Sequence, residues 1–152
     1  MIIRKLDSAE VYRIEACVRE LAVYHNAVPS EFQGVYPLLP VELFLENAAQ
    51  AVRGGGTVVE VIEDGGEVQA FCKTSFAAQY GTLDHLFVTE RCRGLGYGKI
   101  LMDRAMAMFT ERDITKVDIK VVAGNNAAEF YERYGFSLRA VVLSKILQVP
   151  EG

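Results

Sequence analysis

The chain has 152 residues, a formal net charge of −4, and a composition that is 51% hydrophobic. This length suits one domain, expected over residues 1–152, with a core that needs neither disulfides nor a metal. The pI near 5.2 disfavours a wholly basic nucleic-acid-binding surface. No apolar run reaches the about 18 residues of a membrane span, and no secretory signal opens the chain. We therefore expect a cytoplasmic protein that binds neither nucleic acid nor membranes.

The three cysteines are odd in number and widely spaced, at Cys17, Cys72 and Cys92. This usage favours free thiols in a reducing compartment over a disulfide framework. No CxxC, HExxH or paired-histidine spacing is present, so we expect no metal site. Cys92 lies between two arginines but has no histidine or acid at a recognisable partnering spacing, and we interpret it as a loop cysteine.

The first half of the chain is predicted to form a strand, two helices and a β-hairpin. Asp7 or Ser8 can cap the first helix, glycines at 54–56 can end the second, and Asp64-Gly65-Gly66 is typical of a hairpin turn. These elements are a strand over 1–6, a helix from about 8 to 25, a helix over 41–52, and strands over 57–63 and 67–76.

The second half is predicted to alternate between strands and helices. Its elements are a strand over 82–89, a helix over 96–110, a strand over 115–122, a short helix over 125–134 and one or two last strands over 136–147. The order is therefore β-α-α-β-β-β-α-β-α-β. Because a meander of antiparallel strands precedes a βαβ-type crossover, we expect an α/β fold with a mixed sheet.

A basic, glycine-rich turn joins the strand over 82–89 to the next helix. Gly94, Gly96 and Gly98 remove side chains where the first helical N–H groups have no intrahelical partner, so an anion can approach closely. Arg91, Arg93 and Lys99 add positive charge around the same point. The segment therefore predicts a phosphate site, although glycines that only shape a tight turn are the alternative interpretation.

Three kinds of phosphate site compete for this pattern. A triphosphate P-loop needs GxxxxGK[ST], but the spacing from Gly94 to Gly98 is one residue short, and Ile100 replaces the hydroxyl. A dinucleotide fold needs its GxGxxG in the first βαβ unit, whereas this turn follows almost two thirds of the chain. The third kind binds the pyrophosphate of coenzyme A, and Arg93, Gly96 and Gly98 match its [Gln/Arg]-x-x-Gly-x-[Gly/Ala] signature.

A second motif lies about 30 residues downstream, where Asn125-Asn126-Ala127-Ala128-Glu129-Phe130-Tyr131 is followed by Tyr134-Gly135-Phe136. With the strand motif Leu86-Phe87-Val88, the glycine turn and the element order, the sequence resembles the GCN5-related N-acetyltransferase (GNAT) family over essentially the whole chain. The resemblance implies the GNAT-type acyl-coenzyme A N-acyltransferase fold and acetyl-coenzyme A as cofactor. Its pantetheine arm would pair with the main chain of the strand over 82–89, as in β-augmentation. The cofactor-binding residues implied are Phe87, Val88, Arg93, Gly94, Leu95, Gly96, Tyr97, Gly98, Lys99, Asn125 and Asn126.

The resemblance also implies catalytic roles. Tyr131, the tyrosine of the FY pair, matches the general acid that protonates the departing thiolate, and packing on its helix is the alternative. Asp84 matches the family's strand carboxylate, as a base, a base acting through water, or a docking point for a cationic amine; a solvated strand-end carboxylate is the alternative. By strand alternation we expect His85 to face away from Asp84. Lys120 stands where ribosomal-protein acetyltransferases carry a glutamate base, and the spacing from Asn125 to Tyr131 is one residue short.

The implied function is N-acetylation of a primary amine of a small molecule or peptide by direct attack on the thioester. A non-catalytic acyl-coenzyme A-binding or sensor domain, and a structural domain, remain alternatives. The acceptor is expected against the loop over 24–40, and a homodimer is compatible with the resemblance. The candidate acceptor-binding residues are Tyr24, His25, Phe32 and Tyr36.

Overall fold

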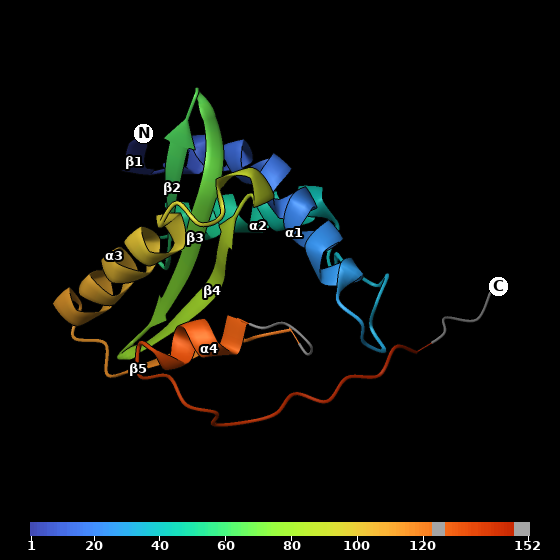
Figure 1. The fold of residues 1–152 in the computed structure, drawn as a ribbon. Helices are drawn as coiled ribbons and strands as arrows, with labels where there is room; N and C mark the ends of the chain where they lie inside the picture. The colour runs from blue at the N-terminus through green and yellow to red at the C-terminus, as the bar shows by residue number, and fades with distance from the viewer. Residues whose placement is uncertain (123–126, 148–152) are drawn as a thin grey trace.

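The computed structural model describes residues 1–122 and 127–147, and its strands form one mixed sheet in the order β1-β2-β3-β4-β5 (Figure 1). The first four strands run antiparallel to their neighbours, and β5 pairs parallel with β4. The predicted meander and mixed sheet are thus confirmed. The strands are β1 Ile2–Lys5, β2 Thr57–Asp64, β3 Glu67–Ala77, β4 Tyr80–Val88 and β5 Lys116–Ile119.

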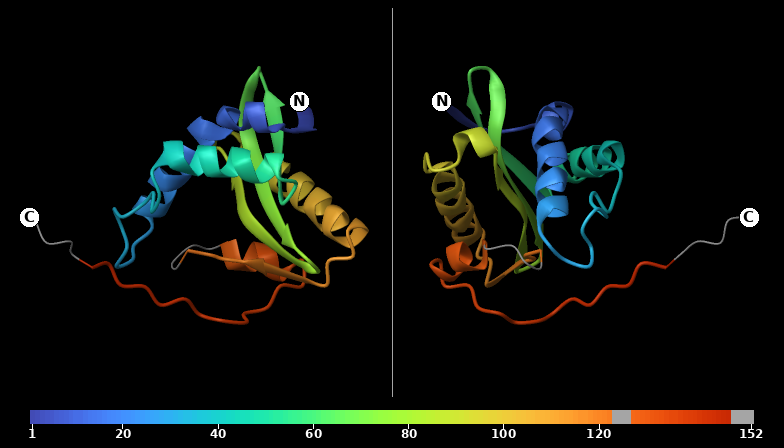
Figure 2. Two further views of the ribbon diagram at one scale, coloured as in Figure 1. Left: turned by 180° about the vertical axis from the view of Figure 1, so that it is seen from behind. Right: turned by 45° about the vertical axis from the view of Figure 1, so that its right-hand side comes forward.

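Helices cover both faces of this sheet, as the two views of Figure 2 show. The 3₁₀ helix η1 and helices α1 and α2 pack on one face, while α3 and α4 pack on the other. A short 3₁₀ turn, η2, precedes α3. The bounds are η1 Ser8–Ile14, α1 Glu15–Ala27, α2 Val41–Arg53, η2 Glu90–Cys92, α3 Tyr97–Glu111 and α4 Ala127–Glu132.

Strand alternation divides the core into two clusters. Val61 and Phe71 are fully buried against the α1 and α2 side, whereas their neighbours Ile62 and Cys72 belong to the cluster beneath α3. Met102 is fully buried at the centre of this second cluster. Both sheet faces are therefore covered by apolar packing, and all three cysteines are buried free thiols.

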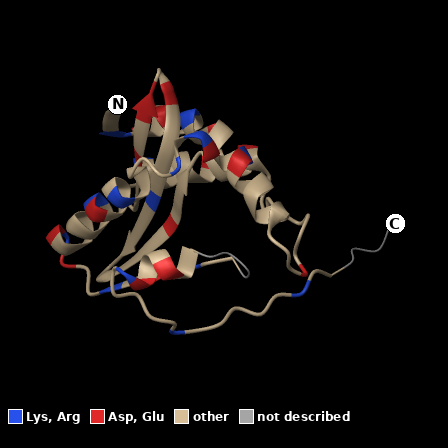
Figure 3. Cartoon of the chain, viewed as in Figure 1, with Lys and Arg blue, Asp and Glu red and all other residues tan. Residues whose placement is uncertain are grey.

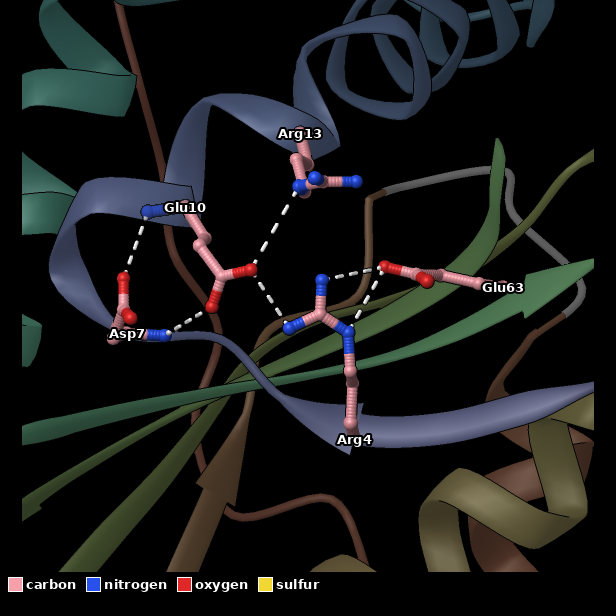
Figure 4. Close-up of polar contacts among 5 residues, drawn as sticks. All are labelled: Arg4, Asp7, Glu10, Arg13 and Glu63. Atoms are coloured by element: carbon pink, nitrogen blue, oxygen red, sulfur yellow. Dashed lines mark hydrogen bonds and ion pairs between the residues drawn. The ribbon is translucent and has the colours of Figure 1, made fainter. Parts of the chain in front are cut away.

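A polar network fixes the N-terminal elements (Figure 4). Asp7 caps η1 by accepting a hydrogen bond from the N–H of Glu10 (3.1 Å), and the Glu10 carboxylate accepts one from the Asp7 N–H (3.4 Å). Arg4 of β1 pairs with Glu10 (2.7 Å) and with Glu63 of β2 (3.0 Å). The predicted cap at Asp7 is confirmed, although its helix begins as a 3₁₀ turn in which the buried Val11 and Ile14 follow the three-residue period.

The predicted last strands over 136–147 are wrong for this structure, since these residues form no strand (Figures 1 and 2). The side chains of Leu138 and Leu143 are 87% and 92% exposed. A strand forms only where its N–H and C=O groups meet a partner strand, and β-propensity without such pairing is insufficient. The apolar pattern therefore predicted burial that this extended segment does not achieve.

None of the described helices is both long and apolar enough to cross a membrane.

Candidate active site

The glycine turn shapes the start of α3. Gly94 and Gly96 have φ angles of 84° and 85°, a left-handed conformation that favours glycine. Gly96 is the N-cap, no side chain caps the helix, and the first helical bond joins the Ile100 N–H to the Gly96 carbonyl oxygen (3.1 Å). The N–H groups of residues 97–99 thus have no acceptor within the helix and are available to an anion.

The third glycine of the turn marks a close approach rather than a special backbone conformation. A Cβ atom at Gly98 would lie 3.8 Å from Val88 Cγ2 and 4.0 Å from Phe130 Cζ, which is ordinary van der Waals contact. The start of α3 therefore packs against both β4 and α4, with room for the methyl group of an alanine. This agrees with the glycine-or-alanine choice at that position of the signature.

Arg93 lies between the turn and the α1 face. Its Nε donates a hydrogen bond to the main-chain oxygen of Val88 (3.2 Å), and its guanidinium lies 4.9 Å from the ring centre of Tyr24. The structure therefore brings together a predicted cofactor residue and a predicted acceptor residue. The sequence motif had suggested only that Arg93 adds charge near a phosphate.

Other side chains of the turn point to protein partners. Lys99 Nζ pairs with Asp103 along the helix (2.7 Å), and the buried Tyr97 donates its hydroxyl hydrogen bond to Asp64 (3.0 Å). Leu95 is 61% exposed. The anion site is consequently built from main-chain N–H groups and the helix dipole more than from these side chains. Charged residues in this region are shown in Figure 3.

Strand β4 has an open edge beside the turn. β5 pairs with β4 only from Tyr80 to Leu83, so within the described chain residues 84–88 have no strand partner on that side. The Phe87 side chain is buried in the α1/α2 cluster, which leaves its main chain as the available part. An extended ligand can therefore add along this edge.

A β-bulge in β4 changes the predicted orientation of His85. Lys73 of β3 pairs with His85 and Thr74 pairs with Leu83, so Asp84 is the extra residue. Asp84 contacts Lys73, and His85 packs on Phe44 of α2, with ring centres 5.1 Å apart. Both side chains therefore lie on the α1/α2 side, and the expectation that His85 faces away from Asp84 is wrong because the bulge interrupts the alternation.

Asp84 is held by neighbours from β3. Its Oδ2 accepts hydrogen bonds from Lys73 Nζ (2.8 Å) and from the Ser75 hydroxyl, which also contacts Thr57 Oγ1 (3.1 Å). The Lys73 and Asp84 side chains are 15% and 19% exposed. Asp84 is therefore a partly buried, ion-paired carboxylate rather than a solvated strand-end residue.

His85 carries an unsatisfied polar atom. Its Nδ1 is buried and has no hydrogen-bond partner within residues 1–122 and 127–147. Burial, with the nearby charge of Lys73, lowers the pKa of His85 to about 4. The imidazole is thus neutral at pH 7.

Tyr131 lies on α4 within the cluster beneath α3. Its ring packs against Phe130 and Phe136, with centroid separations of 5.3 and 6.2 Å. Burial raises the pKa of its phenol to about 12, so the hydroxyl keeps its proton at neutral pH. Asp84 and Tyr131 approach β4 from opposite faces, and a reaction centre that uses both must lie at the open edge of the strand.

Three of the four predicted acceptor residues lie close together in the structure. The His25 ring contacts the rings of Tyr24 and Tyr36 at tilted angles, with centroid separations of 6.0 and 5.0 Å. The side chain of Asn26 holds the main chain of Tyr36 through two hydrogen bonds, of 2.6 and 2.8 Å. Phe32 is half-buried in a separate turn and makes no ring contact among the described residues.

The predicted cofactor residues Asn125 and Asn126 lie outside the described residues.

The surroundings of Asp84 include three residues that the sequence did not single out: Lys73, Ser75 and Phe44. The hairpin register pairs residue 73 with residue 85, so only a correct placement of the bulge would have found Lys73 and Ser75.

A comparison with protein families decides what this architecture is. The model of the acetyltransferase (GNAT) family matches residues 21–136, about three quarters of the chain. This chain belongs to the GNAT family. The family uses acetyl-coenzyme A, so the expected cofactor is that of the family. The uncapped start of α3 and the open edge of β4 fit an anionic, extended ligand of this kind.

Solved structures show the same GNAT fold. A predicted acetyltransferase from Clostridium acetobutylicum with acetyl-CoA matches with a TM-score of 0.75 and 16% identity, covering 95% of each chain. The PaiA N-acetyltransferase from Thermoplasma acidophilum, in complex with coenzyme A, matches with a TM-score of 0.72 and 16% identity, covering 93% of this chain and 92% of the other. An aminoglycoside acetyltransferase from an uncultured soil metagenomic sample, in complex with sisomicin, gives 0.71 and 13%, covering 97% and 96%.

At such identities the likeness shows the fold alone. A search of curated proteins returned no significant match. The acceptor of this GNAT protein must therefore be inferred from its own residues.

Proposed function

We propose that this GNAT protein transfers an acetyl group from acetyl-coenzyme A to the primary amine of a small molecule or peptide. The observation that carries the proposal is the uncapped, glycine-shaped start of α3 beside the unpaired segment 84–88 of β4. The start of α3 suits the diphosphate of coenzyme A, and the unpaired segment of β4 suits its amide-bearing pantetheine arm. Family membership supplies the reaction type.

The donor-binding residues act mainly through their main chain. The N–H groups over 94–99 hold the diphosphate, since the Arg93 N–H already donates to the Glu90 carbonyl oxygen, and the segment around Phe87 and Val88 pairs with the arm. When bound, acetyl-coenzyme A supplies a thioester open to attack by an amine. Arg93 Nε donates a hydrogen bond to the Val88 carbonyl oxygen in this structure, and that oxygen keeps a second lone pair that can accept a bond from the arm.

Tyr131 and Asp84 are the proposed proton donor and acceptor. The bound amine first loses one proton to solvent and becomes neutral. As its nitrogen bonds to the acetyl carbon and the carbon–sulfur bond breaks, Asp84 receives the second proton that the nitrogen loses and passes it to solvent. Tyr131 Oη gives its proton to the departing sulfur and regains one through solvent. The phenol is fully protonated at neutral pH, and proximity supplies most of the remaining acceleration.

Two measurements test this function. Because a ligand that binds only the folded state stabilises it, coenzyme A is expected to raise the melting temperature. Acetyl-coenzyme A is expected to release thiol when a suitable amine is present, in a screen that includes amino acids, amino-acid amides, polyamines and sisomicin. An unchanged melting temperature at millimolar coenzyme A would contradict the donor site.

The second candidate is a non-catalytic acyl-coenzyme A-binding or sensor domain. The pairing of Asp84 with Lys73 favours it, because the carboxylate is already engaged by a protein partner. Lys120 also favours this second candidate, because some relatives carry a glutamate base at its position. A coenzyme A-induced melting shift without thiol release for any amine would select this candidate.

A further inference from the structure

Both side chains of the Lys73–Asp84 ion pair can form further hydrogen bonds. Both the lysine nitrogen (2.8 Å) and the Ser75 hydroxyl bind Oδ2 of Asp84, and Oδ1 has no hydrogen-bond partner within the described chain. The Lys73 ammonium also keeps further N–H donors, since Asp84 is its only hydrogen-bond acceptor in the same residues. Oδ1 has no partner and is not a buried atom, so it reaches solvent, and the Lys73 side chain is 15% exposed.

The pair is held in place from several sides. Lys73 Nζ lies 5.9 Å from the centre of the Phe44 ring, and that ring also packs edge-on against His85. The Ser75 hydroxyl, which donates to the same Oδ2 of Asp84, is itself in contact with Thr57 Oγ1. A positive and a negative group thus stand side by side at a fixed separation, next to the open edge of β4.

This arrangement discriminates between charge types. A simple cationic amine can bind Asp84 Oδ1, but it then meets the ammonium of Lys73, and a partly buried like-charge contact is costly. An anion meets the opposite problem at Asp84. A small zwitterion places its ammonium on Asp84 and its carboxylate on Lys73, so that the four charges alternate in sign and none is left uncompensated.

We infer that the acceptor is an α-amino acid, whose amine binds Asp84 and whose carboxylate binds Lys73. This inference rests on the proposed function and names the substrate class of that site. The amine and carboxylate of an α-amino acid are carried by one carbon atom, which suits charged partners 2.8 Å apart. The ring of Phe44, which packs against His85, borders the pair and is available to the amino-acid side chain.

The test compares each amino acid with its own amide, which keeps the amine and the side chain but lacks the carboxylate. The pairs are L-methionine, L-phenylalanine, L-serine and L-glutamine against their amides, with thiol release as readout. For at least one pair, kcat/KM is expected to favour the acid by about tenfold or more, the effect of one charge-assisted hydrogen bond. Spermidine and sisomicin represent purely cationic acceptors.

Variants at Lys73 provide the control. Lys73→Gln keeps an N–H donor toward Asp84 but removes the charge, and it is expected to lower the acid-to-amide ratio about tenfold. Lys73→Arg should preserve the preference for acids. Lys116→Gln removes an exposed lysine of β5 and should leave the ratio unchanged.

A binding measurement separates this inference from the proposed function. In the presence of saturating coenzyme A, which carries no acetyl group, the preferred amino acid should raise the melting temperature further, whereas its amide should not. Equal use of acids and amides, preference for spermidine or sisomicin, or a ratio unaffected by Lys73→Gln would overturn the inference. If no amino acid binds or reacts although coenzyme A stabilises the protein, the inference falls and the donor site stands. If coenzyme A itself has no effect, the proposed function falls.

Discussion

The hydroxyl of Tyr97 donates a hydrogen bond to Asp64 Oδ2 (3.0 Å) and so ties the first residue of α3 to the end of β2. The ring is buried against the cluster beneath α3. The helix terminus proposed to bind the donor is therefore anchored to the hairpin by a residue whose side chain takes no part in binding.

Removing this hydrogen bond should destabilise the protein and weaken donor binding together. Tyr97→Phe is expected to cost about 1 kcal/mol of unfolding free energy, because it leaves the ring in place and removes one partly buried bond. Urea denaturation measures the stability, and calorimetry measures the affinity for coenzyme A. Tyr12→Phe, on an exposed tyrosine, is the matched control and should change neither.

The glycines of the turn should differ in their tolerance of alanine. Gly96→Ala forces a side chain into a left-handed conformation and is expected to cost about 1–2 kcal/mol and to weaken coenzyme A binding. Gly98→Ala places its Cβ at ordinary contact distances and should be tolerated. Thermal denaturation with and without coenzyme A checks both variants; equal damage from the two would mean that backbone conformation is not the reason for Gly96.

Tyr131→Phe should lower turnover without changing donor affinity. A positioned general acid contributes about a hundredfold or more, so kcat is expected to fall by that order while the coenzyme A-induced melting shift persists. Tyr134→Phe is the control, because its hydroxyl contacts Asp103 rather than the open edge of β4. Unchanged turnover in Tyr131→Phe would remove the proposed acid role.

Stability should fall as the pH drops from 7 to 5. Burial and the charge of Lys73 lower the pKa of His85 to about 4, below its ordinary value near 6.5. Between these values the unfolded chain binds the proton more readily, so the stability contributed by the neutral imidazole is complete above pH about 6.5 and is lost on approach to pH 4.

The loss from pH 7 to pH 5 is expected to be about 2 kcal/mol, measured by urea denaturation at both pH values. His85→Leu should remove most of this dependence. His25, whose pKa is also lowered by burial, contributes in the same direction and accounts for part of what remains in that variant. A pH dependence identical in the wild type and His85→Leu would contradict the assignment to His85.

The sequence by itself determined the local elements and the donor turn. Asp7 caps its helix, the glycines at 65 and 66 make the hairpin turn with positive φ angles, and Gly94 and Gly96 shape the start of α3. Each of these features depends on backbone preferences or on hydrogen bonds between residues close in the chain. Such local rules are legible in residue order, which is why the strands, the helices and the family motif could be predicted.

The tertiary structure decided what depends on contacts between distant segments. A single extra residue in β4 turns Asp84 and His85 to the same side, and pairing with β3 gives Asp84 its partner Lys73, eleven residues away. Residues 136–147 have strand-like composition but meet no partner strand in this structure. Register and edge pairing are set by the packing of the whole sheet, so the acceptor side of the site is visible only in three dimensions.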